Sequence, residues 1–258
     1  MAEQRVAVVT GAGRGIGRAI AERLAADGCC VAVNDIGGDE AAACVAGIEA
    51  SGGRALLAPA DVSDRDAVHA MVAAVVEHYG RLDVMVSNAG IVQVDPVMNI
   101  TEQDFDRLFA INVKGVIWCA QAAAAQMIAQ GEGGKIINAA SIAAFGGDAM
   151  VGTYCASKFS VRALTQSMAQ EFAPHGITVN AYCPGIVDTD MWQIVDERGA
   201  ELTGEPPGSF TADRAAKIPL GRLQTPEDVA NFVSFLASPG ADYITGQSMM
   251  TNGGIRMV

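Results

Sequence analysis

The sequence has few charged residues, few aromatic residues and no long uninterrupted apolar run. Charged residues make up 18% of the 258 residues and aromatic residues 5%, whereas hydrophobic residues make up 50%. A chain of this length and apolar content can bury a sizeable core, which excludes an intrinsically disordered protein. Because Gly, Asp and Arg interrupt every apolar run before it reaches about 18 residues, we expect no transmembrane helix.

Basic residues are scarce as well. The chain has 17 Lys and Arg against 29 Asp and Glu, a formal net charge of −12. No run of basic residues could bind a phosphate backbone or an anionic membrane, so we expect neither nucleic acid nor membrane as a partner. The amino-terminal stretch lacks the basic start and small-residue cleavage site of a signal peptide, which predicts a cytoplasmic protein.

Patterns that bind metal ions are missing too. His69, His78 and His175 fall in separate segments, and the six cysteines show no C-x-x-C spacing. We therefore expect no metal site. The cysteines are expected to be free, mostly buried thiols.

What the sequence does contain is a regular alternation of short β-branched runs and longer helical segments. The strand-like runs are RVAVVT, CCVAVND, RALLAPAD, LDVMVSNAG, GKIINAAS, ITVNAYCPG and GQSMMTNGG. Among the helical segments, SDRDAVHAMVAAVVEHYG is expected to begin with a Ser63 cap, and TPEDVANFVSFLAS with a Thr225 cap followed by Pro226. The alternation predicts an α/β fold with a single domain over residues 1–258. That domain would be a Rossmann-type, doubly wound parallel sheet of about seven strands with helices on both faces.

One segment departs from this regularity. Between Asp188 and Arg222, Gly and Pro cluster between helical fragments. Long irregular segments in compact α/β domains are commonly binding loops, so residues 188–222 are expected to form a substrate-binding lid.

The first strand-like run ends in a glycine-rich turn, TGAGRGIG. Gly11, Gly15 and Gly17 would permit a tight turn, a close approach of the backbone to a pyrophosphate and tight packing of the next helix. Since the amino end of that helix favours an anion, the turn, including Arg14 and Ile16, is expected to bind a dinucleotide.

The second run ends in Asp35, about twenty residues after the turn. A carboxylate at this place accepts hydrogen bonds from the adenosine ribose and repels a 2′-phosphate, which favours NAD over NADP. Arg14 argues the other way, because a guanidinium can pair with that phosphate. We weigh Asp35 more heavily and expect NAD.

Polar and small residues also follow the later strand-like runs. Ligands of open parallel sheets bind at the carboxyl ends of the strands, so these residues are expected to lie around the same ligand. The further residues expected to contact the cofactor are Asp61, Val62, Asn88, Ala89, Gly90, Pro184, Gly185, Val187 and Thr189.

A tyrosine precedes a lysine by four residues in YCASK, at the start of a helical segment. Residues four apart lie on one face of a helix, so Tyr154 and Lys158 are expected side by side. A neighbouring positive charge lowers the pKa of a phenol from its ordinary value of about 10, which would let Tyr154 exchange protons near neutral pH.

Together, the segments TGAGRGIG, SNAG, FAINVKG, YCASK and CPGIVDT resemble the short-chain dehydrogenase/reductase family, in the same order and over essentially the whole chain. The resemblance implies an NAD-dependent oxidoreductase in which Asn112, Ser141, Tyr154 and Lys158 form a catalytic tetrad. It also implies that Tyr154 and Lys158 contact the cofactor, and that the chain forms a homotetramer.

Elementary chemistry offers each tetrad residue a role. Tyr154 would protonate the alkoxide in reduction or deprotonate the alcohol in oxidation, with Lys158 tuning it. Ser141 would hydrogen-bond the substrate oxygen. Asn112 is a poor helix former within a helical segment, so it could distort that helix and hold a proton-relaying water.

Within the family, segments such as NVKGVIW and GITVNAYCPGIVDTDMW are similar to the acetoin reductase/2,3-butanediol dehydrogenase group. This resemblance implies a small pocket at Ser141, Ile142 and Trp192 for a hydroxyketone, diketone or vicinal diol. The stretch FGGDAMVG does not follow that group, and its Asp148 is expected to border the pocket. Two smaller departures from the family are Ser87, where Asn is common, and Asn252, where Asp is common.

Three alternatives stay open. A carboxylate at Asp148 would suit a polyol, as in a sorbitol or galactitol dehydrogenase. A 3-oxoacyl carrier protein reductase is disfavoured, because its acidic partner would be repelled by the charge of −12 and because Asp35 disfavours NADP. A non-catalytic NAD-binding sensor is disfavoured because it would need the glycine turn but not the tetrad.

Overall fold

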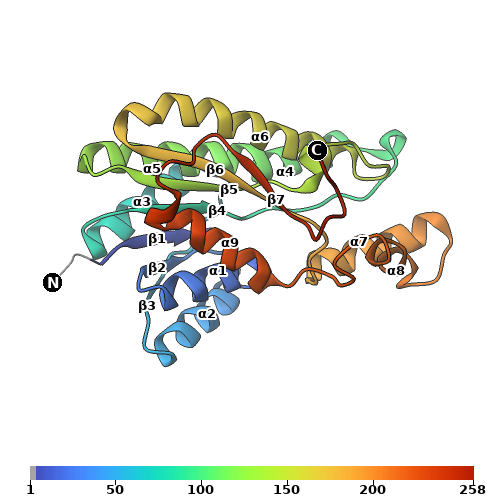
Figure 1. Cartoon of the computed structure of the whole chain (residues 1–258), viewed down its shortest axis with the longest axis horizontal. Helices are drawn as coiled ribbons and strands as arrows, with labels where there is room; N and C mark the ends of the chain where they lie inside the picture. Colours follow the sequence, from blue (N-terminus) through green and yellow to red (C-terminus); the bar gives the residue numbers. More distant parts are fainter. Residues whose placement is uncertain (1–3) are drawn as a thin grey trace.

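The computed structural model describes residues 4–258 and places a parallel sheet between two layers of helices (Figure 1). Within these residues the sheet has seven strands in the order β3-β2-β1-β4-β5-β6-β7, and every neighbouring pair is parallel. The predicted doubly wound fold is therefore confirmed. The strands are β1 (Val6–Val9), β2 (Cys30–Val33), β3 (Arg54–Leu57), β4 (Val84–Ser87), β5 (Gly134–Ala139), β6 (Ile177–Pro184) and β7 (Ser248–Thr251).

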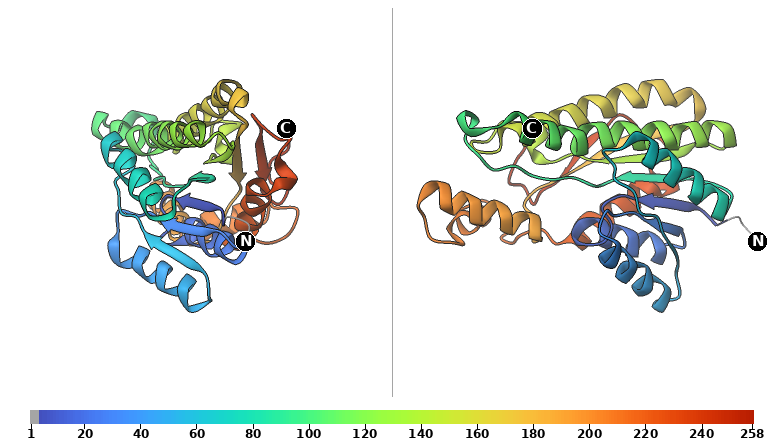
Figure 2. Two further views of the ribbon diagram at one scale, coloured as in Figure 1. Left: turned by 90° about the vertical axis from the view of Figure 1, so that its left-hand side faces the viewer. Right: turned by 180° about the vertical axis from the view of Figure 1, so that it is seen from behind.

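Helices cover both faces of the sheet (Figure 2). Helices α1, α2 and α9 lie on one face, and α3, α5 and α6 on the other. The helices are α1 (Gly15–Ala26), α2 (Gly38–Ala50), α3 (Arg65–Tyr79), α4 (Glu102–Phe109), α5 (Gly115–Gln130), α6 (Gly152–Phe172), α7 (Asp190–Thr203), α8 (Ser209–Ala215) and α9 (Pro226–Ala237). Short helical turns are η1 (Val97–Asn99), η2 (Ala110–Lys114), η3 (Ile142–Ala144), η4 (Ala173–His175) and η5 (Pro239–Ala241).

Successive residues of β1 supply two separate cores. Ala7 and Val9 pack with α1, α2 and α9, whereas Val6 and Val8 pack with α3 and α5. All four side chains are buried because successive residues of a strand point to opposite faces, and both faces are covered here. This is why the strands read as continuous apolar runs rather than as alternating patterns.

The helix caps agree with the sequence at α9 and differ at α3. Thr225 caps α9 and Pro226 is its first residue, as predicted. The expected cap of α3, Ser63, is wrong: the carboxylate of Asp64 accepts hydrogen bonds from two backbone amides of the first turn. A carboxylate also interacts favourably with the helix dipole. The Ser63 hydroxyl instead donates to Asp61 Oδ1, at 2.7 Å.

The stretch Glu102–Gln130 is long and apolar, and comprises α4, η2 and α5. It contains a window that is long and apolar enough to cross a membrane, although no uninterrupted run predicted one. Half of that window, 50%, is buried, and α5 packs against α3, β4 and β5. The burial accounts for the composition, since a core helix facing a sheet and two helices is apolar on most sides.

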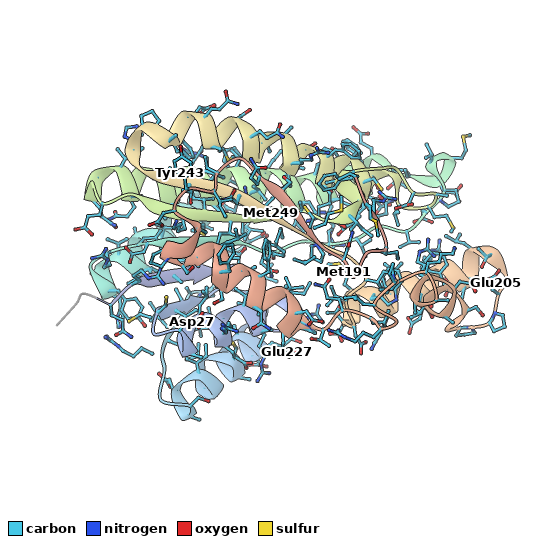
Figure 3. The ribbon with its side chains drawn as sticks, in the orientation of Figure 1. Asp27, Met191, Glu205, Glu227, Tyr243 and Met249 are labelled. Carbon is cyan, nitrogen blue, oxygen red and sulfur yellow. The ribbon has the colours of Figure 1, made fainter. Side chains whose placement is uncertain are left out.

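Residues 188–222 form mostly two helices, α7 and α8. They extend from the carboxyl edge of the sheet, away from the rest of the molecule (Figure 2, right). Met191 lies at the base of this projection and Glu205 at its far end (Figure 3). Apart from Gly199, which lies within α7, the Gly and Pro residues that suggested an irregular loop therefore mark the turns between and after these helices.

Candidate active site

The glycine turn lies between β1 and α1, where the backbone leaves no room for side chains. Gly11 and Gly15 have φ angles of +61° and +53°, which other residues rarely adopt. A Cβ atom at Gly17 would lie 2.0 Å from the carbonyl oxygen of Gly11. The turn thus presents bare backbone at the amino end of a helix, a geometry that fits the pyrophosphate of a dinucleotide.

Asp35 follows β2 and faces this turn. Its carboxylate accepts hydrogen bonds from the backbone amide of Gly13, at 2.9 Å, and from that of Gly37, at 3.1 Å. Arg14, the residue that argued for NADP, pairs with Asp190 at 3.2 Å and more loosely with Glu40 at 3.9 Å. The basic group at the turn is therefore already matched by two carboxylates.

Asn88 joins β1, β4 and β6 below the turn. Its amide nitrogen donates to the carbonyl oxygens of Thr10 and Gly11, at 2.8 and 3.1 Å. Its oxygen accepts a 2.8 Å hydrogen bond from the buried hydroxyl of Tyr182. Thr10 and Tyr182 were not predicted from the sequence as site residues. For Tyr182, the only indication in the sequence was a tyrosine hydroxyl within an otherwise apolar strand.

The remaining predicted cofactor residues lie at, or shortly after, the carboxyl ends of strands. The Asp61 carboxylate is exposed, whereas Val62 is buried and packs against the start of α5. A Cβ at Gly90 would lie 3.6 Å from Lys158 Nζ, so this glycine opens the backbone beside the lysine. The other predicted residues of this set at the edge are Ile16, Ala89, Pro184, Gly185, Val187 and Thr189.

Tyr154 and Lys158 lie in the first two turns of α6, as the spacing predicted. The Lys158 Nζ atom is 5.5 Å from the centre of the Tyr154 ring and donates a 2.8 Å hydrogen bond to the carbonyl oxygen of Ala139. The lysine side chain crosses from the helix to the end of β5 and is only 4% exposed. Its ammonium is thereby held beside the phenol.

The pKa values of this pair have moved apart, so the expected lowering of the Tyr154 pKa is wrong for the chain by itself. Burial lowers the pKa of Lys158 to about 8. Burial also raises the pKa of Tyr154 to about 12, while a hydrogen bond with the Ser141 side chain acts in the opposite direction. In the chain by itself the phenol therefore keeps its proton at neutral pH, and a further positive charge is required before it can act as a base.

Asn112 occupies a π-helical turn, η2, between α4 and α5. This is the helix distortion that its low helix propensity predicted. Its side-chain oxygen accepts from the backbone amide of Ile91 and its nitrogen donates to the Ile91 carbonyl oxygen, both at 2.9 Å. The nitrogen also lies 3.2 Å from Ser157 Oγ. Asn112 thus ties the segment after β4 to α6.

Ser141 follows β5 and caps the turn η3. Its hydroxyl oxygen accepts a 3.1 Å hydrogen bond from the backbone amide of Ala143, and the residue is 8% exposed. Because the Ser141 side chain also hydrogen-bonds Tyr154, three of the four predicted tetrad residues are joined around α6. Asn112 reaches the same helix through Ser157.

The expected pocket residues lie in two different places. Ile142 is in η3, directly after Ser141. Trp192 lies in α7, where its indole nitrogen donates to Thr211 Oγ1 at 2.8 Å and its ring stacks on Phe210 at 6.3 Å. Trp192 therefore fastens the two projecting helices together, and its contact with a substrate stays a prediction.

Asp148 is the pocket residue whose surroundings differ most from expectation. Its carboxylate is paired with the guanidinium of Arg256 from the carboxyl terminus, at 3.4 Å. The negative charge of Asp148 also acts on Arg214 in α8, whose pKa is lowered by burial and raised by that charge. Arg256 thus pairs with the carboxylate that the polyol alternative would use, and the charge of that carboxylate also reaches Arg214.

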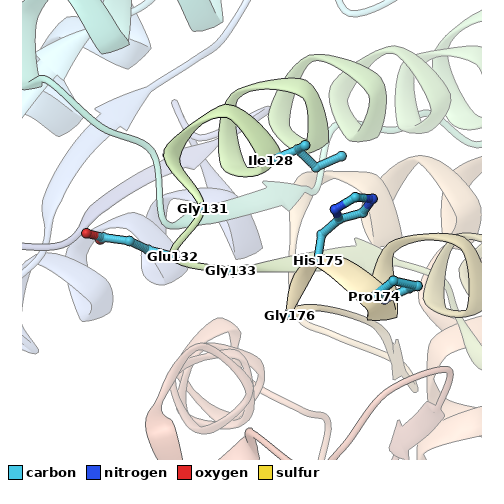
Figure 4. Close-up of a pocket in the computed structure, with 7 residues that line it drawn as sticks. All are labelled: Ile128, Gly131, Glu132, Gly133, Pro174, His175 and Gly176. Carbon is cyan, nitrogen blue, oxygen red and sulfur yellow. The ribbon is translucent and has the colours of Figure 1, made fainter.

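Two hollows lie outside this cluster of residues. One, of about 510 Å³, is at the opposite edge of the sheet, where β5 and β6 begin (Figure 4). Ile128, Glu132 and His175 are among its lining residues. The other, of about 530 Å³, lies between the end of the projection and the segment after β7, and includes Leu220 and Gly253.

The cysteines have the predicted state, since all six are free and buried. Burial raises the pKa of the two thiols near Tyr154, those of Cys155 and Cys183, the latter to about 12. Such thiols are poor nucleophiles at neutral pH. In the part of the chain that the structure describes, no group of three His, Cys, Asp or Glu side chains could hold a metal ion.

A glycine turn after β1, an acidic residue after β2 and a tyrosine–lysine pair at one edge of a parallel sheet define a nicotinamide-dependent oxidoreductase. The chain belongs to the short-chain dehydrogenase family, which matches residues 5–199. It is accordingly an enzyme that interconverts secondary alcohols and ketones.

Curated relatives cover nearly the whole chain. An L-2,3-butanediol dehydrogenase of Corynebacterium glutamicum is 45% identical over 97% of this chain and 98% of its own. A diacetyl reductase [(S)-acetoin forming] of Staphylococcus epidermidis is 46% identical over the same shares. A sorbitol dehydrogenase of Cereibacter sphaeroides is 42% identical over 97% of this chain and 96% of its own. A short-chain type dehydrogenase/reductase from Mycobacterium marinum superposes with a TM-score of 0.91 at 35% identity, covering 98% of this chain and 96% of its own.

Proposed function

We propose that the protein is an NADH-dependent reductase of small hydroxyketones or diketones such as acetoin and diacetyl, which also oxidises the matching vicinal diol. The observation that carries this proposal is the joining of Ser141, Tyr154 and Lys158 at the carboxyl edge of the sheet, beside the glycine turn. The names of the relatives that are 45% and 46% identical support the substrate class.

The reaction assigns Tyr154 the proton transfer. The cofactor would supply the hydride for the carbonyl carbon when bound. Tyr154 would donate its proton to the carbonyl oxygen as negative charge develops there. With a pKa near 12, the phenol carries its proton at neutral pH and gives it up only as negative charge develops on the carbonyl oxygen. Ser141 stabilises the developing charge on the oxygen by a hydrogen bond.

In the reverse direction Tyr154 must take a proton from the alcohol. Lowering its pKa from about 12 towards 7 needs roughly 7 kcal/mol of differential stabilisation, at about 1.4 kcal/mol per pKa unit. Lys158, held beside the ring by Ala139, supplies one positive charge and the oxidised nicotinamide a second. Oxidation should therefore speed up with rising pH more than reduction does.

Three carboxylates around the glycine turn favour NADH over NADPH. Asp35 faces the turn, while Glu40 and Asp190 both lie close to Arg14. The one guanidinium at the turn is thus outnumbered, and a 2′-phosphate would meet net negative charge.

A polyol substrate is the second candidate, because the sorbitol dehydrogenase relative is 42% identical over nearly the whole chain. The pairing of Asp148 with Arg256 counts against it, since the guanidinium competes with a polyol for this carboxylate. We place the small ketone first for this reason. A 3-oxoacyl carrier protein reductase is disfavoured by the net charge of −12.

We further propose a homotetramer built on the outer faces of α5 and α6. Each helix exposes one large apolar side chain, Ile128 on α5 and Phe159 on α6, at 40% and 42% exposure. Light scattering after size-exclusion chromatography should give a mass four times that of the 26.6 kDa chain. A monomer would contradict this assembly.

The test of the substrate is an absorbance assay that follows NADH or NADPH. The purified protein is given diacetyl, acetoin, the butanediol isomers, sorbitol, galactitol and an acetoacetyl thioester in turn. Fast NADH-linked turnover of acetoin or diacetyl is expected. Turnover on sorbitol or galactitol alone would move the assignment to polyol oxidation. Turnover on none of them, with tight NADH binding, would contradict the proposal.

A further inference from the structure

The carboxyl-terminal segment folds back onto the loop that carries Ser141. The Arg256 guanidinium donates to the carbonyl oxygen of Ile142 at 2.9 Å and, more loosely, to that of Gly146 at 3.4 Å. The same group pairs with Asp148. One side chain thus binds the beginning, middle and end of the stretch Ile142–Asp148, which follows Ser141 directly.

The backbone of that stretch is shaped to receive the arginine. A Cβ atom at Gly146 would lie 2.7 Å from Arg256 Nη1, whereas one at the neighbouring Gly147 would meet nothing within 4 Å. Two residues beyond Asp148, Met150 has a φ of +66°, a left-handed conformation that is strained for a non-glycine residue. Such strain persists only where the surrounding contacts hold the chain in place.

Asn252 in turn places Arg256. Its side-chain nitrogen donates to the Arg256 carbonyl oxygen at 2.7 Å, and its oxygen accepts from the amide of Gly254 at 2.9 Å. Aspartate, with two acceptor oxygens, has no hydrogen to donate to that carbonyl. The side-chain amide of Asn252 therefore closes the turn. Asn252, Arg256 and Asp148 are connected by hydrogen bonds and an ion pair.

The same segment also contacts the base of the projecting helices. The amide of Leu220 donates to the carbonyl oxygen of Gly253 at 3.2 Å, and a Cβ at Gly253 would lie 2.7 Å from Ile218. Residues 252–256 therefore connect the end of the segment 188–222 with the loop after Ser141.

We propose that Arg256 is a positioning residue that acts through the Ile142–Asp148 loop to hold Ser141 against the substrate oxygen. The inference rests on the proposed function. Arg256 does not touch the reacting atoms; it restricts the loop so that the Ser141 hydroxyl stays in hydrogen-bonding geometry, where small displacements reduce the rate strongly. Asp148 serves as the counter-ion of Arg256 rather than as a ligand of the substrate.

The first test uses two neighbouring glycines. Gly146→Ala should push the Arg256 guanidinium off the loop and lower kcat about tenfold, with the Kd for NADH unchanged. Gly147→Ala, where a methyl group has open space, is the matched control and should keep normal turnover. Arg256→Ala should behave like Gly146→Ala. Arg256→Lys should recover part of the rate, because lysine keeps the positive charge but lacks the planar guanidinium that binds several acceptors at once. Equal kcat values for Gly146→Ala, Arg256→Ala and Gly147→Ala would overturn the proposal.

The second test asks whether the effect passes through Ser141. In a Ser141→Ala background, Arg256→Ala should lower kcat by less than twofold, whereas a merely structural role would lower it by the same factor in both backgrounds. Additive losses would therefore contradict the proposal.

Hydrogen exchange separates this inference from the proposed function, because it needs no substrate. The amides of Ala144 and Phe145 are hydrogen-bonded within the loop. Arg256→Ala should speed their exchange at least about tenfold, while Arg23→Ala, which removes a surface ion pair on α1, should not. Unchanged exchange would overturn the positioning role of Arg256 even if the enzyme reduces acetoin. Faster exchange in a protein without turnover on the assay panel would refute the proposed substrate alone.

Discussion

Tyr154 and Lys158 illustrate how burial at a single helix end prepares two side chains for proton transfer. The phenol has a raised pKa and the ammonium a lowered one, so each is less stable in its charged form than it would be in water. Positive charge brought by a cofactor would favour the phenolate strongly in this surrounding, because electrostatic interactions are less screened away from water. The pair is thus set to respond to the cofactor's charge.

Tyr154→Phe keeps the ring and removes the proton. We expect turnover to fall at least about a hundredfold while the Kd for NADH changes less than about threefold. Steady-state kinetics and NADH fluorescence titration measure the two quantities. Near-normal turnover would exclude Tyr154 as the acid.

Asp35→Ser removes the carboxylate that faces the glycine turn. We expect kcat/KM with NADH to fall about tenfold or more and kcat/KM with NADPH to rise, because the 2′-phosphate no longer meets that charge. Glu49→Gln, an exposed acidic residue on α2, is the control for loss of one negative charge. An unchanged ratio of kcat/KM with NADH to kcat/KM with NADPH would mean that Asp35 does not contact the adenosine ribose.

At the scale of elements, each strand end contributes one or two residues, and the close packing of neighbouring backbones decides whether they meet. The turn between β1 and α1 touches the segment after β4 directly, since a Cβ at Gly11 would lie 2.9 Å from the Cα of Ala89. The projecting helices begin at the same turn, where Arg14 pairs with Asp190. Movement of these helices would therefore change the contacts of Arg14 in the glycine turn.

Gly17→Ala tests this packing. Its methyl group would meet the Gly11 carbonyl oxygen at 2.0 Å, and backbone cannot move aside as a side chain can. We expect a loss of roughly 2–4 kcal/mol in the free energy of unfolding and much weaker NADH binding. Gly38→Ala at the start of α2 has open space and should be close to neutral. Denaturant unfolding of both variants measures the difference, and equal stabilities would contradict the expected clash.

At the scale of the whole molecule, the buried Lys158 costs stability that function requires. Its pKa is about 8 in the folded chain and near the ordinary 10.5 when unfolded. Between these values the unfolded chain binds more protons, so stability gained from this residue rises with pH in that window. The cost is complete below about pH 8 and fades as the pH approaches 10.5.

Lys158→Met should therefore be inactive but more stable than the parent at neutral pH, by roughly 1–3 kcal/mol after allowing for the lost hydrogen bond to Ala139. The advantage should shrink as the pH is raised from 8 to 10. Urea unfolding at several pH values gives both numbers. A difference that does not vary with pH would show that Lys158 carries no such penalty.

The fold and most of the site could be predicted because they depend on short-range patterns. Alternating apolar strands and helices predicted the parallel sheet, since burial on both faces demands that pattern. The spacing of Tyr154 and Lys158 predicted their neighbourhood because it is a property of the helix itself. The cap of α3 was mispredicted by one residue because Ser63 and Asp64 both suit that place and only packing selects one.

Long-range contacts were decided by tertiary structure alone. Pairing of Asp148 with Arg256, 108 residues apart, and the hydrogen bond from Tyr182 to Asn88, 94 residues apart, leave no periodic trace in the chain. The sequence by itself thus determined the class of fold, the glycine turn and the tyrosine–lysine pair, each of which depends on neighbours within a few residues. The neighbours of Asp148, Trp192 and Arg14 were decided only when the sheet brought distant segments together, since a side chain's partners depend on the packing of the whole molecule.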